Sequence, residues 1–495
     1  MPKLQSLFKD TVIYGLSSIV GRFLNYLLVP LYSYSMTAES GNYGIVTNIY
    51  AWTALILVIL TFGFETTFMR FAGKYENNLP KVFSMSLQVV AAICVLFLVS
   101  IFSNIDSISQ ALGYSQHPEF VTMMSVVISL DAVQAIIFTY LRFKKRPIKF
   151  ASLKLLFIGM SIALNLVAFL LMPYLYRNNP SLIGEFYDPD NQAYYIFLIN
   201  LICTATITLF FIPELKLFRF TADRKLLKEM LAYSWPILLL GLAGILNLHA
   251  DKIIYTMLVP GEQGKVELSV YGAVVKIAAI MAMLIQAFKY AYEPIVFKMG
   301  NGKESKEYQA IAMKYFIAIA LLAFLAVVFY MDILRHIIAP DYWIGLKVVP
   351  IVMIAEIIMG IYQNLSNWYK LNDETWWGAI FSTAGCAMLF VINILFVPEY
   401  GYYACAIASL IGFSVAMLLS YFVGQKRNPI TYDLKSIFGY VALAAVLWAV
   451  SQLVPIEDNV LHLSFNTLLI LVYIGYFVKN DLPVKQIPIL KRFFK

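Results

Sequence analysis

The sequence contains little charge for its length. Only 13% of its 495 residues are Asp, Glu, Lys or Arg, while 61% are hydrophobic. Soluble domains carry about 25% charged residues, so this composition excludes an ordinary soluble protein. Positions 82–102 and 191–213 contain no charged residue at all. Apolar runs of about 20 residues are long enough to cross the hydrocarbon layer of a membrane.

Cysteine and catalytic motifs are also scarce. The four cysteines all lie inside apolar runs, which predicts buried packing residues and no disulfide or metal framework: Cys94, Cys203, Cys386 and Cys405. The chain has no P-loop, which argues against an ATPase, and no GxSxG or HExxH pattern. We therefore expect a protein that is not an enzyme and holds no metal or cofactor.

What the chain does contain is a long series of hydrophobic segments. We predict 14 transmembrane helices at 11–33, 42–64, 82–103, 119–141, 151–173, 193–213, 229–250, 268–292, 309–331, 345–366, 375–397, 401–423, 436–454 and 461–478. The fold class is therefore an all-α integral membrane protein. The first of these segments lacks a small-residue cleavage site, so we expect it to be retained as a helix.

The loops differ sharply in positive charge. Thirty of the 37 Lys and Arg residues fall in one alternate set of loops, which includes both termini. Cytoplasmic loops carry such an excess, so this set is predicted to face the cytoplasm. The same bias explains the net charge of +8 without a nucleic-acid partner.

Two short landmarks recur at the same distance from a carboxylate. Glu65 follows Gly44 by 21 residues, and Glu293 follows Gly272 by the same distance; each glycine stands in a Tyr-Gly-x-Val motif. The landmarks open the second and eighth segments. These lie six apart and point the same way, which indicates a parallel repeat.

The repeat predicts three parts. Helices 1–6 form an N-lobe at 1–223, helices 7–12 form a C-lobe at 224–424, and helices 13–14 with a cytoplasmic tail occupy 425–495. Duplicated membrane proteins of this size are typically transporters, with the substrate path between the halves.

Cations inside the segments are candidate substrate contacts. Arg22 lies near the middle of the first segment with Asn25 one turn on, and the eighth carries Lys276, Gln286 and Lys289. A charge at that depth costs several kcal/mol unless it is paired or hydrated, so these side chains are expected to face an aqueous cavity and an anionic substrate. The alternatives are a structural ion pair for Arg22 and snorkelling of the lysines to the interface, favoured for Lys289.

Carboxylates occupy corresponding segments of both halves. Asp131, with Gln134 at i+3, is centred in the fourth segment, and Glu356 is centred in the tenth. Each is a candidate for coupling to H⁺ or Na⁺. The alternative is charge pairing that holds helices together. Asn247, His249 and Asp251 at the end of the seventh segment are expected to form a hydrogen-bond network rather than a metal site.

Five stretches together resemble a known family. They are Asp10–Gly15, Tyr43–Val46, Gly63–Phe71, Ala250–Ile254 and Tyr271–Lys276. In order and spacing they are similar to the Wzx-type O-antigen and capsule flippases, polysaccharide biosynthesis proteins of the multidrug/oligosaccharidyl-lipid/polysaccharide (MOP) exporter superfamily. The resemblance implies two parallel six-helix lobes around a central cavity, a MOP/MATE-like fold with two extra C-terminal helices, and alternating access.

The resemblance also implies an activity and its partners. Such a protein transfers an undecaprenyl-diphosphate-linked oligosaccharide, the repeat unit of an O-antigen, capsule or exopolysaccharide, from the inner to the outer leaflet of the bacterial cytoplasmic (inner) membrane. An ion gradient or the membrane potential would drive it. Partners would be the lipid-linked glycan, membrane lipids and glycan polymerase or assembly proteins. Arg22 and Lys276 fit the cationic cavity of the family, and helices 13–14 would help shape a groove for the lipid tail.

Two other readings remain open. A cation-coupled drug or metabolite antiporter of the MATE type has the same architecture, although it usually has 12 helices and an acidic cavity. A membrane polymerase, ligase or glycosyltransferase usually needs a sizeable outer loop, whereas the longest outer loop predicted here is 174–192.

Overall fold

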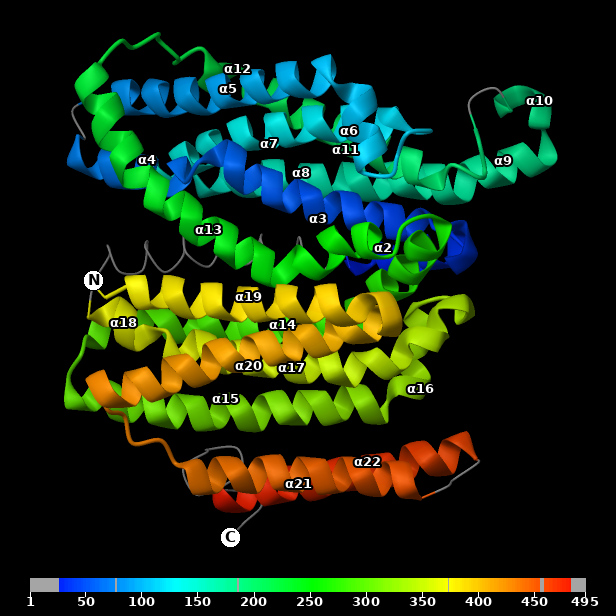
Figure 1. Cartoon of the computed structure of the whole chain (residues 1–495), viewed down its shortest axis with the longest axis vertical. Coiled ribbons are helices and arrows are strands. Elements are labelled where there is room, and N and C mark those ends of the chain that lie inside the picture. Colours follow the sequence, from blue (N-terminus) through cyan, green and yellow to red (C-terminus); the bar gives the residue numbers. More distant parts are fainter. Residues whose placement is uncertain (1–25, 76–77, 185–186, 373, 455–457, 482–495) are drawn as a thin grey trace. The chain divides into compact units, whose positions relative to one another are not determined.

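The computed structural model describes residues 26–75, 78–184, 187–372, 374–454 and 458–481. All regular structure in these ranges is helical (Figure 1). Thirteen helical segments in the described chain are long and apolar enough to cross a membrane. The predicted helical membrane fold is therefore confirmed. Most of the first predicted segment, 11–33, lies outside the described residues, so the count of 14 stays a prediction.

The helices overlap the predicted segments, although those at 229–250 and 268–292 extend further at both ends. In the first part of the chain they are α2 (Leu28–Ser35), α3 (Asn42–Thr61), α4 (Phe64–Lys74), α5 (Leu79–Ser103), α6 (Ile105–Ala111), α7 (Pro118–Phe143), α8 (Pro147–Leu166), the π-helix η3 (Val167–Leu171), α9 (Met172–Asn178), α10 (Pro180–Ile183), α11 (Gln192–Phe210), α12 (Ile212–Leu215) and α13 (Arg224–Leu258).

The remaining helices continue the series. They are α14 (Glu262–Met299), α15 (Lys303–Phe329), α16 (Met331–Leu334), α17 (Val349–Leu365), α18 (Asn367–Leu371), α19 (Trp376–Tyr400), α20 (Tyr402–Arg427), α21 (Leu434–Leu453) and α22 (Asn459–Asn480). Short 3₁₀ turns at Ala38–Ser40, Arg335–Ile337 and Pro340–Val348 connect some of them.

Proline and glycine set several boundaries. Pro118 and Pro147 occupy the first turns of α7 and α8, where a missing backbone N–H costs nothing. The predicted segment 42–64 is interrupted near its end, because Phe62 and Gly63 have φ of 48° and 70°. This left-handed pair ends α3 and starts α4 at Phe64.

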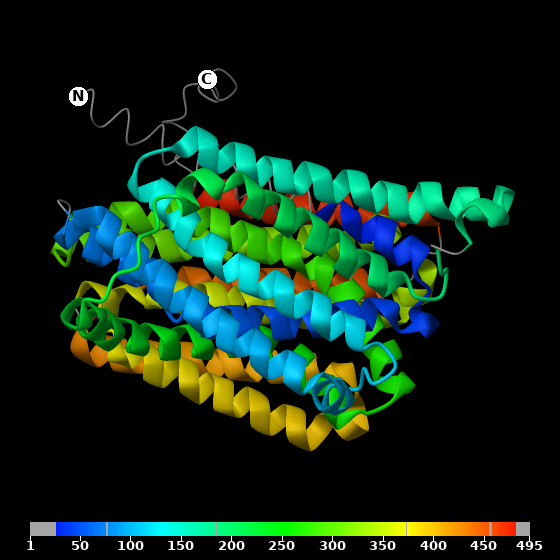
Figure 2. The same cartoon turned by 90° about the horizontal axis from the view of Figure 1, so that it is seen from above.

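The chain forms two compact units. Unit 1 comprises Met1–Ala273, Asp341–Ile344 and Leu389–Cys405; unit 2 comprises Val274–Pro340, Gly345–Met388 and Ala406–Lys495. The predicted boundaries at 223 and 424 describe the sequence repeat and stay a prediction. In each unit, long helices run beside one another, as Figures 1 and 2 show.

Aromatic side chains form the core of unit 1 where α4, α5 and α7 meet. Phe64, Phe68 and Phe83 are fully buried, and the rings of Phe83 and Tyr140 lie 4.6 Å apart. Met230 of α13 joins the same cluster. Four helices are thereby fixed to one another around the beginning of α4.

The repeated glycines lie where α3 crosses the start of α14 in unit 1. A Cβ on Gly44 would stand 2.0 Å from the backbone oxygen of Lys265, and a Cβ on Gly272 would stand 2.3 Å from Oγ1 of Thr47. The backbone N–H of Gly44 donates to Ser269 Oγ at 2.7 Å. The two sequence landmarks thus mark one close helix crossing that only glycine allows.

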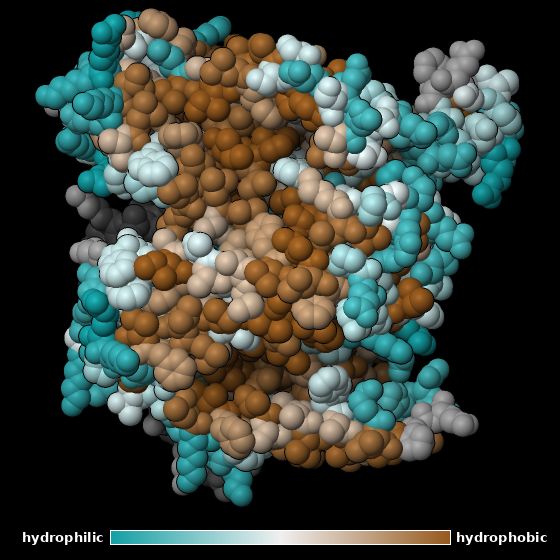
Figure 3. All heavy atoms as spheres, in the orientation of Figure 1, coloured by the Kyte–Doolittle hydropathy of each residue, from teal (hydrophilic) through white to brown (hydrophobic). Residues whose placement is uncertain are grey.

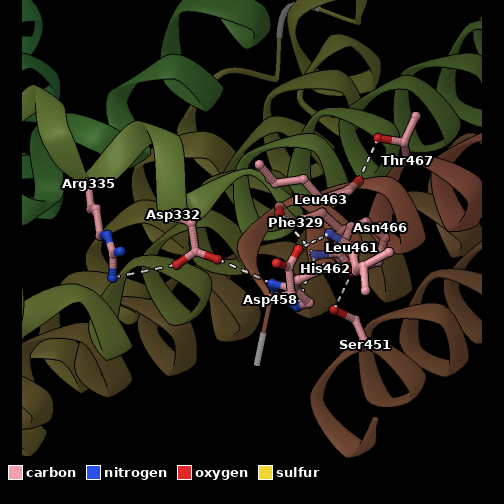
Figure 4. A network of polar contacts seen from close by, with 10 residues as sticks. All are labelled: Phe329, Asp332, Arg335, Ser451, Asp458, Leu461, His462, Leu463, Asn466 and Thr467. Atoms are coloured by element: carbon pink, nitrogen blue, oxygen red, sulfur yellow. Dashed lines mark hydrogen bonds and ion pairs between the residues drawn. The ribbon is translucent and has the colours of Figure 1, made fainter. Parts of the chain in front are cut away.

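In unit 2, α21 and α22 pack on α15 and are held to it by polar contacts at both ends. At one end, His462 contacts Asp332 at 3.2 Å, and Asn466 Nδ2 donates to the backbone oxygen of Phe329 at 3.1 Å (Figure 4). At the other end, Lys314 pairs with Asp481 and lies 3.7 Å from Asp433.

The outer surfaces suit a lipid environment. Apolar side chains cover the lengths of the helices on the face in Figure 3, and hydrophilic ones gather at the helix ends. On α5, for example, Leu96 is 68% exposed and Val95 is 59% exposed. Exposed aliphatic side chains along a helix are stable against lipid tails, so the chain is a multi-pass membrane protein.

Candidate functional site

The middle of α7 places a carboxylate and an amide against α11. Thr204 Oγ1 donates to Asp131 Oδ1 at 3.4 Å. Gln134 Nε2 donates to the backbone oxygen of Thr204 and to Thr208 Oγ1, each at 2.9 Å. The i, i+3 spacing read from the sequence therefore brings Asp131 and Gln134 to one helix face, where two threonines orient them.

A charged cavity of about 410 Å³ lies beside this pair within unit 1. Glu65, Asp131, Arg142 and Lys154 line it, together with Gln134. Lys154 comes from α8, where its charge acts on both Asp131 and Glu65, and its Nζ lies 4.2 Å from the centroid of the Phe138 ring. Two carboxylates and two cations balance one another, which suits exchange of H⁺ or a small cation better than binding of a diphosphate.

The helix break at Phe62 and Gly63 positions Glu65 in this cavity. It places Glu65 in the first turn of α4, where the helix N-terminus favours a negative charge. A guanidinium nitrogen of Arg142 lies 3.8 Å from the Glu65 carboxylate. The duplicated carboxylate of the first half therefore pairs with the cation that ends α7.

The duplicated carboxylate of the second half has matching neighbours in unit 2. Glu293 lies 3.4 Å from Lys370 and 3.8 Å from Lys289. Lys370 stands on α18, directly after the tenth predicted segment, as Arg142 stands at the end of the fourth. This second cluster carries one excess positive charge and suits an anionic group.

The other predicted residues of the eighth and tenth segments lie on α14 and α17. Lys276 is exposed, while Gln286 and Glu356 are partly buried. Ten residues separate Lys276 from Gln286, about 15 Å along a helix, so only an extended ligand can touch both. Lys289 belongs to the charge cluster around Glu293.

Arg22 and Asn25 lie outside the described residues. Their role as cavity contacts remains a prediction.

Sequence reasoning missed three members of these clusters. Arg142, Lys154 and Lys370 were counted only as loop charges that set the orientation of the chain. The available signal was the equal spacing of Glu65 and Glu293, because a carboxylate that recurs in a membrane repeat requires a partner of opposite charge. Which cation becomes the partner of each carboxylate depends on how α8 and α18 pack against the other helices. No local sequence pattern indicates this packing.

The end of the seventh segment forms a hydrogen-bond network. Tyr271 OH donates to Asp251 Oδ2 at 2.7 Å, and Lys252 Nζ lies 2.8 Å from the same carboxylate. Asn48 Nδ2 donates to the backbone oxygen of Lys252 at 2.7 Å. Among the described residues, no group of three or more His, Cys, Asp or Glu side chains could hold a metal ion.

Unit 2 also contains an apolar groove of about 240 Å³. Its walls come from α15, α17, α20, α21 and the loop between the last two: Met313, Ile317, Ile361, Leu365, Met417, Leu418, Tyr421, Tyr432, Leu434 and Ile437. With this lining, the groove fits a hydrocarbon chain.

Comparison with solved structures identifies the fold. The chain is similar to "Lipid II flippase MurJ, inward closed conformation" (TM-score 0.70, 15% identity, 96% of this chain and 99% of the other). It is also similar to an inward-facing multidrug resistance MATE family transporter of the MOP superfamily (TM-score 0.61, 15% identity, 85% and 95%). At such identity the likeness shows the fold, which is that of MurJ and the MATE transporters.

Sequence comparison identifies the family. A search of curated proteins found no match. The sequence model described as "Polysaccharide biosynthesis protein" matches residues 7–300, more than half of the chain. This match agrees with the resemblance seen in the motifs. The chain therefore belongs to the polysaccharide biosynthesis protein family.

Proposed function

We propose that this protein is a flippase that moves an undecaprenyl-diphosphate-linked oligosaccharide from the inner to the outer leaflet of the bacterial inner membrane by alternating access. The observation that carries the proposal is the combination of a polysaccharide biosynthesis family with the fold of a lipid II flippase. Both termini would lie in the cytoplasm, as the positive charge of the loops predicts.

The two extra C-terminal helices, α21 and α22, favour a flippase over a drug antiporter. The MurJ structure matches 96% of this chain, whereas the MATE structure matches 85%. In unit 2, the apolar groove is bordered by α21, the first helix of the extra pair. A prenyl tail would exchange lipid for protein side chains of similar polarity in this groove, so its binding there would depend on packing contacts.

The polar part of the substrate requires cations and hydrogen-bonding groups. The diphosphate would meet the predicted cavity residues Arg22, Asn25 and Lys276, the attached glycan would extend to Gln286, and the cluster at Lys289 would attract the diphosphate on entry. Outward movement of its negative charge is favoured by about 2.3 kcal/mol per charge per 100 mV of membrane potential.

Coupling to H⁺ or Na⁺ would add to this drive. Asp131 is the candidate in unit 1. The charged side chains that line the cavity beside it sum to zero, so one bound cation would change the net charge of the cavity. Glu356 is the corresponding candidate in unit 2.

The test uses a host deleted for this gene, with variants returned on plasmids. We expect the wild-type chain to restore surface glycan, and Arg22→Ala or Lys276→Ala to leave complete lipid-linked units in the cytoplasmic leaflet. A normal amount of surface glycan in the deleted host would contradict the proposal.

The second candidate function is a MATE-like cation antiporter, which the carboxylates Asp131 and Glu356 favour. It predicts that the deletion raises sensitivity to cationic drugs, and that Asp131→Asn or Glu356→Gln fails to restore resistance.

A further inference from the structure

A second polar cavity lies in unit 1, away from the charged cavity of α7. Its volume is about 540 Å³, the larger of the two. One wall is the face of α3 that carries Ile45 and Trp52, another is the loop between α6 and α7, and the third is the turn between α13 and α14. Both connecting segments belong to the loops predicted to face outward, so this cavity opens toward the outer side.

Buried hydrogen bonds hold the loop wall in place. Tyr114 is 3% exposed, and its OH donates to Asn48 Oδ1 at 2.9 Å. Asn48 in turn is anchored to the backbone of α13, as described above. His117 stacks on Phe120 with ring centroids 4.8 Å apart and contacts Glu119 at 2.9 Å. A wall fixed in this way requires little ordering when a ligand binds.

The lining has the chemistry of a site for a neutral polar ligand. Trp52 offers an aromatic face, while Gln110 and Gln116 offer amide donors and acceptors. The two charged residues of the lining, Lys265 and Glu262, form an ion pair at 2.8 Å and so neutralise each other. No excess charge selects a phosphate, and the polar loops do not suit a hydrocarbon tail.

Sugar residues match this combination. A pyranose ring presents C–H groups on one face and hydroxyls around its edge, so it stacks on an aromatic ring and bonds to amides at the same time. We propose that this cavity is a carbohydrate-binding subsite for the glycan head group on the outer side. The proposal rests on the flippase function and adds a second contact point beyond the translocation path.

The first experiment measures glycan binding directly. The full chain is purified into lipid nanodiscs, and the probe is the free glycan released by mild acid from the lipid-linked pool of the host. We expect Trp52→Ala to weaken binding by about tenfold, since truncated aromatic anchors commonly cost more than 1 kcal/mol. Trp52→Phe keeps a stacking ring and is expected to retain most of the affinity.

A matched control removes a tryptophan elsewhere. Trp235 of α13 is 54% exposed and does not line this cavity, so Trp235→Ala is expected to bind the glycan like wild type. Equal affinity of wild type, Trp52→Ala and Gln116→Ala would overturn the proposal. Loss of surface glycan in the Trp52→Ala strain with unchanged glycan binding would also overturn it, in favour of a docking face for an assembly protein.

Failure of the flippase function gives a different pattern. In that case the wild-type chain would not change leaflet access of lipid-linked glycan in vesicles, whatever the binding result. Transport by wild type without Trp52-dependent binding would reject the subsite alone.

Discussion

At the residue scale, the glycine crossing makes the sharpest stability prediction. Gly44→Ala would push a Cβ into the backbone of α14, and backbone cannot rotate away. We expect a loss of about 1–3 kcal/mol, seen as a lower Tm of the purified protein. Gly159→Ala on α8 is the control, because nothing lies within 4 Å of its Cβ. An equal Tm for both variants would contradict the crossing.

A second residue-scale prediction concerns Glu214, whose side chain is 3% exposed and lies 2.7 Å from Lys149 Nζ. Glu214→Gln leaves that ammonium without its charge partner, and we expect it to cost about 1–3 kcal/mol of stability. Glu307→Gln removes an exposed pair with Lys303 and should cost less than about 1 kcal/mol. Thermal unfolding of the two variants side by side measures the difference.

The cap of α13 adds a pH dependence. Asp223 accepts a bond from the backbone N–H of Leu226 at 3.0 Å and pairs with Lys81 at 2.7 Å, which together lower the pKa of its carboxyl. A lowered pKa stabilises the fold above the ordinary pKa of about 4, and this contribution is lost as pH falls through the folded value. Asp223→Asn should therefore lose less stability than wild type between neutral and acid pH. An identical dependence of stability on pH in wild type and Asp223→Asn would contradict a stabilising role of this cap.

At the element scale, α21 and α22 are held to α15 by polar contacts rather than by apolar packing alone. Lys314→Met removes the cation between Asp433 and Asp481, so we expect faster hydrogen exchange in α21 and α22. Lys479→Met, at the exposed end of α22, is the control. Unchanged hydrogen exchange in Lys314→Met would mean that other contacts hold α21 and α22 to α15.

Helix positions could be predicted from the sequence because apolar runs and flanking prolines report them locally. The break between α3 and α4 could not, since Phe62 adopts a positive φ that its type disfavours. The same distinction applies to the site. The spacing of Asp131 and Gln134 is a helical property, whereas the approach of Lys154 from α8 depends on tertiary packing.

At the scale of the whole molecule, we expect the two carboxylates of the predicted repeat to be needed for the proposed transport. Glu65 and Glu293 each pair with a cation at the end of a later segment in their own unit. We expect Glu65→Gln and Glu293→Gln to lower surface glycan severalfold while the protein still reaches the membrane, because each leaves a cation unpaired. Glu304→Gln, an exposed position at the start of α15, should have no effect.

The most direct test of the proposed flippase activity follows glycan movement itself. The protein is reconstituted in vesicles with a lipid-linked oligosaccharide that carries a fluorescent group on its glycan, and an impermeant reductant quenches whatever reaches the outside. We predict that a membrane potential or an ion gradient lets the reductant quench inner-leaflet glycan in vesicles with wild-type protein, and that quenching is slower with Lys276→Ala. Quenching limited to the outer leaflet, with or without protein and under every gradient, would contradict it.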